Sequence, residues 1–184
     1  MKKALLIIDY TYDFIADDGK LTCGKPGQDI DGAIVERIKQ YEASKEPIFV
    51  LRDLHYEGDT AHPESKLFPP HNIFGTAGRE VYGETRKVLE ELNRERPEQV
   101  FWMDKTRYSS FARTDLADRL NRLNVDAVEL TGVCTDICIL HTAISAYNLG
   151  FDVIIPQNAV ASFSPEGHTF ALGHMKDCLG AELV

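Results

Sequence analysis

Short apolar runs alternate with segments of helical periodicity along most of the 184-residue chain. The runs that we expect to be strands are residues 4–8, 47–51, 99–103, 126–130 and 153–155, with a short final strand at 181–184. Between them, the spacing of apolar residues predicts helices over residues 30–41, 84–93, 114–123, 135–149 and 165–178. This alternation predicts an α/β fold with a doubly wound, mostly parallel sheet and helices on both faces.

Length and composition narrow the class of protein. The length suits one domain, so we expect residues 1–184 to share a single core. The net charge of −9 argues against nucleic acid or an anionic membrane as partner, because both need a basic surface. The first apolar run is too short for a signal peptide, and no run reaches the ~20 apolar residues of a membrane helix. We therefore expect a cytoplasmic protein whose four cysteines are reduced.

Two long stretches, residues 10–29 and 54–83, interrupt the regular pattern. Loops of this length in a compact domain are usually functional or disordered. The second stretch holds three of the six histidines, so we expect it to be functional. The glycine-rich turn of a dinucleotide-binding protein is missing after the first strand, which removes the main support for that class.

Polar residues follow four of the predicted strands. Asp9 ends the first strand, Asp53 and His55 follow the second, Lys105 follows the third, and Cys138 comes shortly after the fourth. In a doubly wound sheet, ligands bind outside the carboxyl ends of the strands. These side chains are therefore expected to converge on one site.

Cys138 lies near the first turn of a predicted helix, where unpaired N–H groups and the helix dipole stabilise a thiolate. The same N–H groups would suit an oxyanion. The alternative for Cys138 is a small buried helix residue. Asp9 and Lys105 beside this thiol would form a nucleophile-activating set, although Asp9 alone could cap a turn and Lys105 alone could be solvated.

Asp53, His55, Glu64 and His71 form a second group, with His62 as a competitor. Oxygen and nitrogen donors in this mixture suit Zn, Fe or Mn. The alternative is a loop that merely contains scattered His and Glu. Cys134 and Cys138 are spaced i, i+4, but no second cysteine pair follows, so a structural zinc site is not expected.

The motifs together resemble those of the isochorismatase-like cysteine hydrolases, and within them the nicotinamidase/pyrazinamidase group, over nearly the whole chain. Residues 9–14 match the pattern D-x-Q-x-x-F except that Thr11 replaces the glutamine, which removes no proposed catalytic atom. Lys105 matches a lysine after the third strand, and residues 132–138 match G-V-x-T-x-x-C in full. The resemblance implies one isochorismatase-like hydrolase domain over residues 1–184.

Carried over, the resemblance implies an Asp9–Lys105–Cys138 triad. It also implies a cis peptide between Val133 and Cys134, with the N–H groups of Cys134 and Cys138 forming an oxyanion hole. The nicotinamidase group adds one divalent transition metal, with zinc first and Fe or Mn as alternatives. Its implied ligands are Asp53, His55, His71 and a fourth residue that varies between His and Glu, here assigned to Glu64 rather than His62.

The activity that the resemblance implies is hydrolysis of nicotinamide to nicotinate and ammonia, in pyridine nucleotide salvage. The partner would be a small molecule, nicotinamide or a pyrazinamide-like analogue, and the chain could form a homo-oligomer. We expect the aromatic ring to be held by Phe14, Phe68, Trp102 and Tyr108. Two alternatives stay open: another small-amide or carbamoyl hydrolase of the same family, and a thiol-based binding or sensor protein without turnover.

Overall fold

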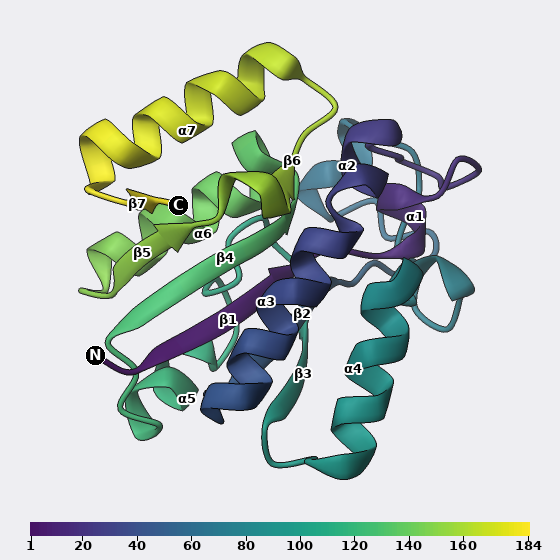
Figure 1. Ribbon diagram of the computed structural model, residues 1–184. Helices are drawn as coiled ribbons and strands as arrows, with labels where there is room; N and C mark the ends of the chain where they lie inside the picture. The colour runs from purple at the N-terminus through teal and green to yellow at the C-terminus, as the bar shows by residue number, and fades with distance from the viewer.

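A parallel sheet forms the centre of the computed structural model, which describes residues 1–184 (Figure 1). Its strands are β1 (Lys3–Ile8), β2 (Ile48–Asp53), β3 (Val100–Lys105), β4 (Ala127–Val133), β5 (Asp152–Ile155), β6 (Val160–Ala161) and β7 (Glu182–Leu183). The strand order is β3-β2-β1-β4-β5-β7, every pair is parallel, and β6 pairs with the end of β4. This arrangement confirms the predicted fold class.

Helices cover both faces of the sheet, because successive residues of a strand point to opposite sides. The α-helices are α1 (Tyr12–Ile15), α2 (Lys25–Asp29), α3 (Asp31–Ser44), α4 (Gly83–Glu95), α5 (Leu116–Arg122), α6 (Leu140–Asn148) and α7 (Pro165–Leu179). On β1, Leu6 and Ile8 pack toward α5, α6 and α7, whereas Leu5 and Ile7 pack toward α3 and α4. None of the helices is long and apolar enough to span a membrane.

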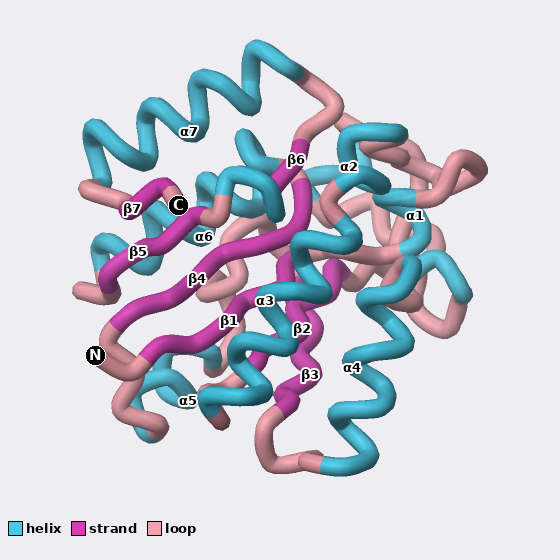
Figure 2. The backbone as a smooth tube through the Cα atoms, in the orientation of Figure 1, coloured by secondary structure: helices cyan, strands magenta, loops and turns pink.

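The loops gather at the end of the sheet where β1 and β4 finish, next to α1 and α2 (Figure 2). Shorter helical turns lie in this region: the 3-10 turns η1 (Pro63–Lys66), η2 (Ala77–Arg79) and η4 (Gln157–Ala159), and the π-helical turn η3 (Thr135–Ile139). The two long stretches predicted to be functional thus lie at the carboxyl ends of the strands, where a doubly wound sheet binds its ligands.

Several elements differ from the sequence prediction, among them α1 and α2, which lie in a stretch for which no helix was predicted. The helix predicted over residues 135–149 is divided into η3 and α6, and β2 continues as far as Asp53. The two-residue strand β6 was not predicted, because it is too short to show an alternating pattern. The differences at β2, β6 and η3 lie at or beside the carboxyl ends of strands, where local contacts in the site override regular periodicity.

Candidate active site

Three ionisable side chains meet at the carboxyl ends of three strands. Asp9 directly follows β1, Lys105 is the last residue of β3, and Cys138 lies in η3, just after β4. Lys105 Nζ lies 2.7 Å from Asp9 Oδ2 and 3.7 Å from Cys138 Sγ. Asp9 is 0% exposed, Lys105 1% and Cys138 8%. The structure therefore brings together the three residues that the sequence indicated as a nucleophile-activating set.

The backbone around Asp9 is tightly constrained. Asp9 has a φ of 55°, a left-handed conformation that costs a non-glycine residue about 1 kcal/mol. On the neighbouring strand, Gly132 has a φ of 109°, and a Cβ added there would lie 2.0 Å from the carbonyl oxygen of Ile8. Only glycine fits at position 132, so β1 and β4 approach closely just before each delivers a site residue.

Burial and charge together set the protonation of the three groups. Burial raises the pKa of Asp9 to about 6, although the Lys105 ammonium opposes the shift. Burial alone would lower the pKa of Lys105, but the charges of Asp9, Cys138 and Asp53 outweigh it and raise the pKa. Burial also raises the pKa of the Cys138 thiol well above its usual range. The resting site therefore holds a charged lysine, a neutral thiol and a carboxyl group that titrates near neutral pH.

The turn that carries Cys138 is π-helical, a geometry that is rare and often found at functional sites. The carbonyl of Cys134 accepts hydrogen bonds from the N–H groups of Ile137 and Ile139, both at 3.1 Å. The peptide bond between Val133 and Cys134 is cis, which confirms that prediction. The hydrogen bonds of the loops and turns include none donated by the N–H of Cys134, which leaves this group available to a ligand.

Next to the thiol, Asp53, His55, Glu64 and His71 form a buried cluster whose ligand atoms all lie within 4.8 Å of one another. Asp53 Oδ2 is 2.5 Å from His55 Nε2 and 3.4 Å from His71 Nε2. Glu64 Oε2 is 4.0 Å and 3.6 Å from the same two nitrogens. Asp53 Oδ1 and His71 Nε2 are buried without a hydrogen-bond partner. Two carboxylates and two imidazoles at this spacing fit a divalent transition metal.

The orientation of His71 suits a ligand. Its Nδ1 lies 2.7 Å from the carbonyl oxygen of Pro69, so Nε2 faces the cluster. Burial lowers the pKa of His71, but the nearby carboxylates of Asp53 and Glu64 outweigh it and raise the pKa to about 10.

His62, the competing ligand candidate, lies beside the cluster but outside it. Its Nε2 is 2.8 Å from the carbonyl oxygen of Thr106, and its Nδ1 accepts the backbone N–H of Glu64 at 3.2 Å. Both ring nitrogens are thus occupied by the protein, which leaves neither free for a metal. This geometry supports Glu64 as the fourth ligand, with His62 holding the backbone of that residue.

Arg79 is a polar contributor that the sequence did not indicate. Its Nε donates to the carbonyl oxygen of Asp53 at 2.9 Å, and its Nη2 lies 2.5 Å from Asp104 Oδ1. It therefore ties the end of β2, which carries a cluster residue, to the residue that precedes Lys105 on β3. A single arginine in a long loop carries no periodicity or motif that would single it out.

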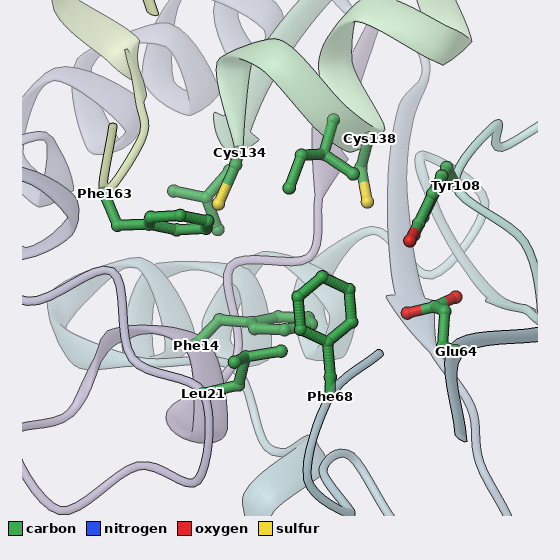
Figure 3. Close-up of a pocket in the computed structure, with 10 residues that line it drawn as sticks. Phe14, Leu21, Glu64, Phe68, Tyr108, Cys134, Cys138 and Phe163 are labelled. Atoms are coloured by element: carbon green, nitrogen blue, oxygen red, sulfur yellow. The ribbon is translucent and has the colours of Figure 1, made fainter. Parts of the chain in front are cut away.

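A mostly apolar pocket of about 380 Å³, including its open mouth, lies over the thiol. Its lining residues are Phe14, Leu21, Glu64, Phe68, Tyr108, Val133, Cys134, Ile137, Cys138 and Phe163 (Figure 3). Cys138 and Glu64 line the same pocket, so the thiol and one member of the cluster face the same space. Leu21, Ile137 and Phe163 were not predicted, because isolated apolar residues in loops look no different from core residues.

Trp102 requires a correction, because it does not line this pocket. Its indole N–H donates to Asn93 Oδ1 at 3.2 Å, and the Arg52 guanidinium lies 5.2 Å from the centre of its ring. On β3, Trp102 is three residues from Lys105, and side chains an odd number of positions apart point to opposite faces of a strand. Trp102 therefore packs on the α4 side of the sheet.

The fold and site define a parallel α/β protein with a buried thiol, a carboxylate and an amine at the strand ends. The Isochorismatase domain family matches residues 3–183. The chain belongs to this family, as its motifs indicated.

Similar proteins extend over the full chain. An uncharacterized isochorismatase family protein of Bacillus subtilis, PncA, is 49% identical over 184 residues, covering 100% of both chains. The crystal structure of a pyrazinamidase/nicotinamidase from Streptococcus mutans has a TM-score of 0.95 and 54% identity, again covering 100% of both chains. The structure of a Pyrococcus horikoshii pyrazinamidase in complex with zinc has a TM-score of 0.87 and 29% identity, covering 100% of this chain and 99% of that one.

Proposed function

We propose that the protein hydrolyses nicotinamide to nicotinate and ammonia through a thioester on Cys138. The observation that carries this proposal is that Glu64, a member of the buried Asp53, His55, Glu64 and His71 cluster, lines the same pocket as the Cys138 thiol. The likeness to a Streptococcus mutans pyrazinamidase/nicotinamidase over the full chain supports it. A simple thiol sensor would not need a buried carboxylate and ammonium beside its sulfur.

The acid–base chemistry falls to Asp9. Asp9 takes the proton of the Cys138 thiol, and the sulfur attacks the carboxamide carbon to give a tetrahedral oxyanion. Asp9 then gives that proton to the departing nitrogen, the C–N bond breaks, and ammonia leaves a thioester. In the second half, Asp9 takes a proton from water, the water oxygen displaces the sulfur, and Asp9 returns this proton to the sulfur to restore the thiol. The nicotinic acid that leaves loses its remaining proton to solvent and becomes nicotinate. A pKa near 6 suits a group that must both accept and release a proton near neutral pH.

Lys105 and two backbone groups stabilise the charges that develop. The Lys105 ammonium, 2.7 Å from Asp9 and 3.7 Å from the sulfur, favours the anionic form of both groups. The N–H groups of Cys134 and Cys138 would hold the oxyanion, in a buried site where such hydrogen bonds are strong. The triad and these donors thus transfer the protons and stabilise the charges of the two steps.

The cluster fits a metal ion for two reasons. Its oxygen and nitrogen donors suit such an ion, and two of its buried atoms, Asp53 Oδ1 and His71 Nε2, have no hydrogen-bond partner. We propose that Asp53, His55, Glu64 and His71 hold one divalent transition metal, with zinc as the first candidate. When bound, such an ion supplies a Lewis acid that can coordinate the pyridine nitrogen and fix the position of the ring. Phe14, Phe68 and Tyr108 would enclose the ring, since they line the same pocket.

Incubation of the purified protein with nicotinamide, with release of both ammonia and nicotinate measured, tests the function. Mass spectrometry of the acid-quenched enzyme should show a nicotinoyl adduct on the peptide that contains Cys138. Chelation should reduce turnover while iodoacetamide still alkylates Cys138, because the triad does not depend on the metal for its nucleophile. Release of ammonia from N-carbamoylsarcosine but not from nicotinamide would favour the carbamoyl hydrolase alternative. Failure to hydrolyse either amide would favour a sensor.

A further inference from the structure

Phe163 lines the end of the pocket that lies away from the metal cluster. Figure 3 shows Glu64 at one end, Phe163 next to Cys134 at the other, and Cys138 between them. Phe163 belongs to the segment between β6 and α7, and its side chain is 51% exposed. Phe163 thus lines the pocket but has no role in the proposed chemistry.

Hydrogen bonds on both sides of Phe163 fix its segment to the turn that carries the nucleophile. Ser162 Oγ donates to Asp136 Oδ1 at 2.6 Å and accepts the backbone N–H of Ser164 at 3.2 Å. Ser164 Oγ in turn accepts the N–H of Gly167 at 3.0 Å, which caps α7. Asp136 packs closely against Gly167, because a Cβ there would lie 2.0 Å from Asp136 Oδ2 and the Asp136 side chain would have to move.

Asp136 lies two residues before Cys138 in η3. The neighbouring Thr135 adds a second connection, since its Oγ1 lies 2.8 Å from His168 Nδ1 on α7. The backbone that carries Phe163 is therefore held to the same turn as the reactive sulfur. The distance from the nucleophile to the aromatic ring is set by this network rather than by a free loop.

We propose that Phe163 is a specificity-determining residue that limits the size of the amide reaching Cys138. The preferred substrate class would be single-ring aromatic carboxamides that carry no bulky substituent on the ring edge away from the metal cluster. This proposal rests on the proposed function for its substrate, but the steric limit at Cys138 can be measured without turnover.

The first experiment compares kcat/KM for 5-methylnicotinamide and for nicotinamide. Phe163→Ala should raise the ratio of the two values by about tenfold, the effect of one methyl-sized change in an apolar pocket. Phe163→Trp should lower the ratio. Phe170→Ala is the matched control, because Phe170 is also an exposed aromatic residue, 63% exposed, but lies on α7 away from the pocket. Its ratio should stay within twofold of the wild type.

The second experiment measures access to Cys138 by alkylation with iodoacetamide and with the bulkier N-phenylmaleimide. Peptide mass spectrometry assigns each adduct, since Cys178 is exposed and will also react. Phe163→Ala should raise the rate with N-phenylmaleimide relative to iodoacetamide by about tenfold, and Ser162→Ala should shift it in the same direction by loosening the segment. Circular dichroism confirms that each variant is folded.

An alkylation ratio that is equal in the wild type, Phe163→Ala and Phe170→Ala would overturn the proposal, whatever the turnover data show. An equal change in both alanine variants would overturn it as well. If nicotinamide is not hydrolysed while the alkylation ratio shifts in Phe163→Ala alone, the steric limit is supported and the proposed function fails by itself.

Discussion

The Asp9 carboxylate accepts a 2.8 Å hydrogen bond from the backbone N–H of Asp53. The side chain of Asp53 belongs to the proposed metal cluster, whereas Asp9 belongs to the proposed triad, so the two sites share a contact. Lys105 adds a second link, because its Nζ lies 2.7 Å from Asp9 Oδ2 and 3.7 Å from Asp53 Oδ1. Changes to a metal ligand therefore need a readout that separates metal binding from proton transfer.

Cys138→Ala should reduce nicotinamide turnover by about 10⁴-fold or more, because the thiol beside Lys105 is lost. The fold and the metal content should be unchanged, since the sulfur does not belong to the cluster. Cys178→Ala, at an exposed cysteine, should keep wild-type activity. Substantial hydrolysis by purified Cys138→Ala protein would remove Cys138 from the role of nucleophile.

Asp9→Asn should lower kcat by at least the ~10²-fold that is typical for loss of a general acid or base. Asparagine keeps the size of the side chain and can still accept the Asp53 N–H, but it cannot take the thiol proton. Steady-state kinetics should show the loss in kcat rather than in KM. A near-normal kcat would mean that a different group accepts the proton.

Glu64→Ala should lower metal affinity by more than the ~10- to 100-fold that loss of an outer-shell partner costs, because a direct ligand is removed. His62→Ala should have the smaller, outer-shell effect, because His62 hydrogen-bonds the backbone of Glu64 rather than facing the cluster. Elemental analysis and competition with a chelator measure both. The reverse order of effects would show that His62 is the fourth ligand.

The pH dependence of Cys138 alkylation in chelated protein should report the protonation of Asp9. Because burial raises the pKa of Asp9 to about 6, the carboxyl group becomes neutral below that pH and can no longer accept the thiol proton. The rate with iodoacetamide should therefore fall by roughly fivefold from pH 6 to pH 5, as expected for one group titrating near 6. Asp9→Asn should lack the break near pH 6, and its rate should instead rise steadily with pH as the thiol ionises. An identical profile in both proteins would show that Asp9 does not control the sulfur.

Much of the site could be predicted from the sequence because the sheet is parallel. Asp9, Asp53 and Lys105 lie at or just after the carboxyl ends of strands whose apolar runs are easy to recognise. Parallel pairing brings these ends to one edge, so convergence follows without knowledge of any loop. The motif at residues 132–138 then places Cys138 at the same edge.

The features that were missed depend on contacts between distant parts of the chain. The π-helical form of η3 keeps the apolar spacing of an ordinary helix, so sequence periodicity does not distinguish the two. Leu21 and Phe163 reach the pocket only because their loops pack against it. Trp102 could have been excluded from the sequence, since strand alternation places it on the face opposite Lys105.

The bare Cα of Gly132 has a consequence for how the enzyme can change over evolution or in the laboratory. Since the backbone of β4 lies directly against that of β1 at Ile8, no side chain separates the strand ends that lead to Asp9 and Cys138. Substitution of core residues by larger or smaller ones therefore cannot change the distance between the two strands at this point. New substrate ranges should therefore arise by exchange of the surrounding loops, while the spacing of the proton carrier and the sulfur is inherited unchanged.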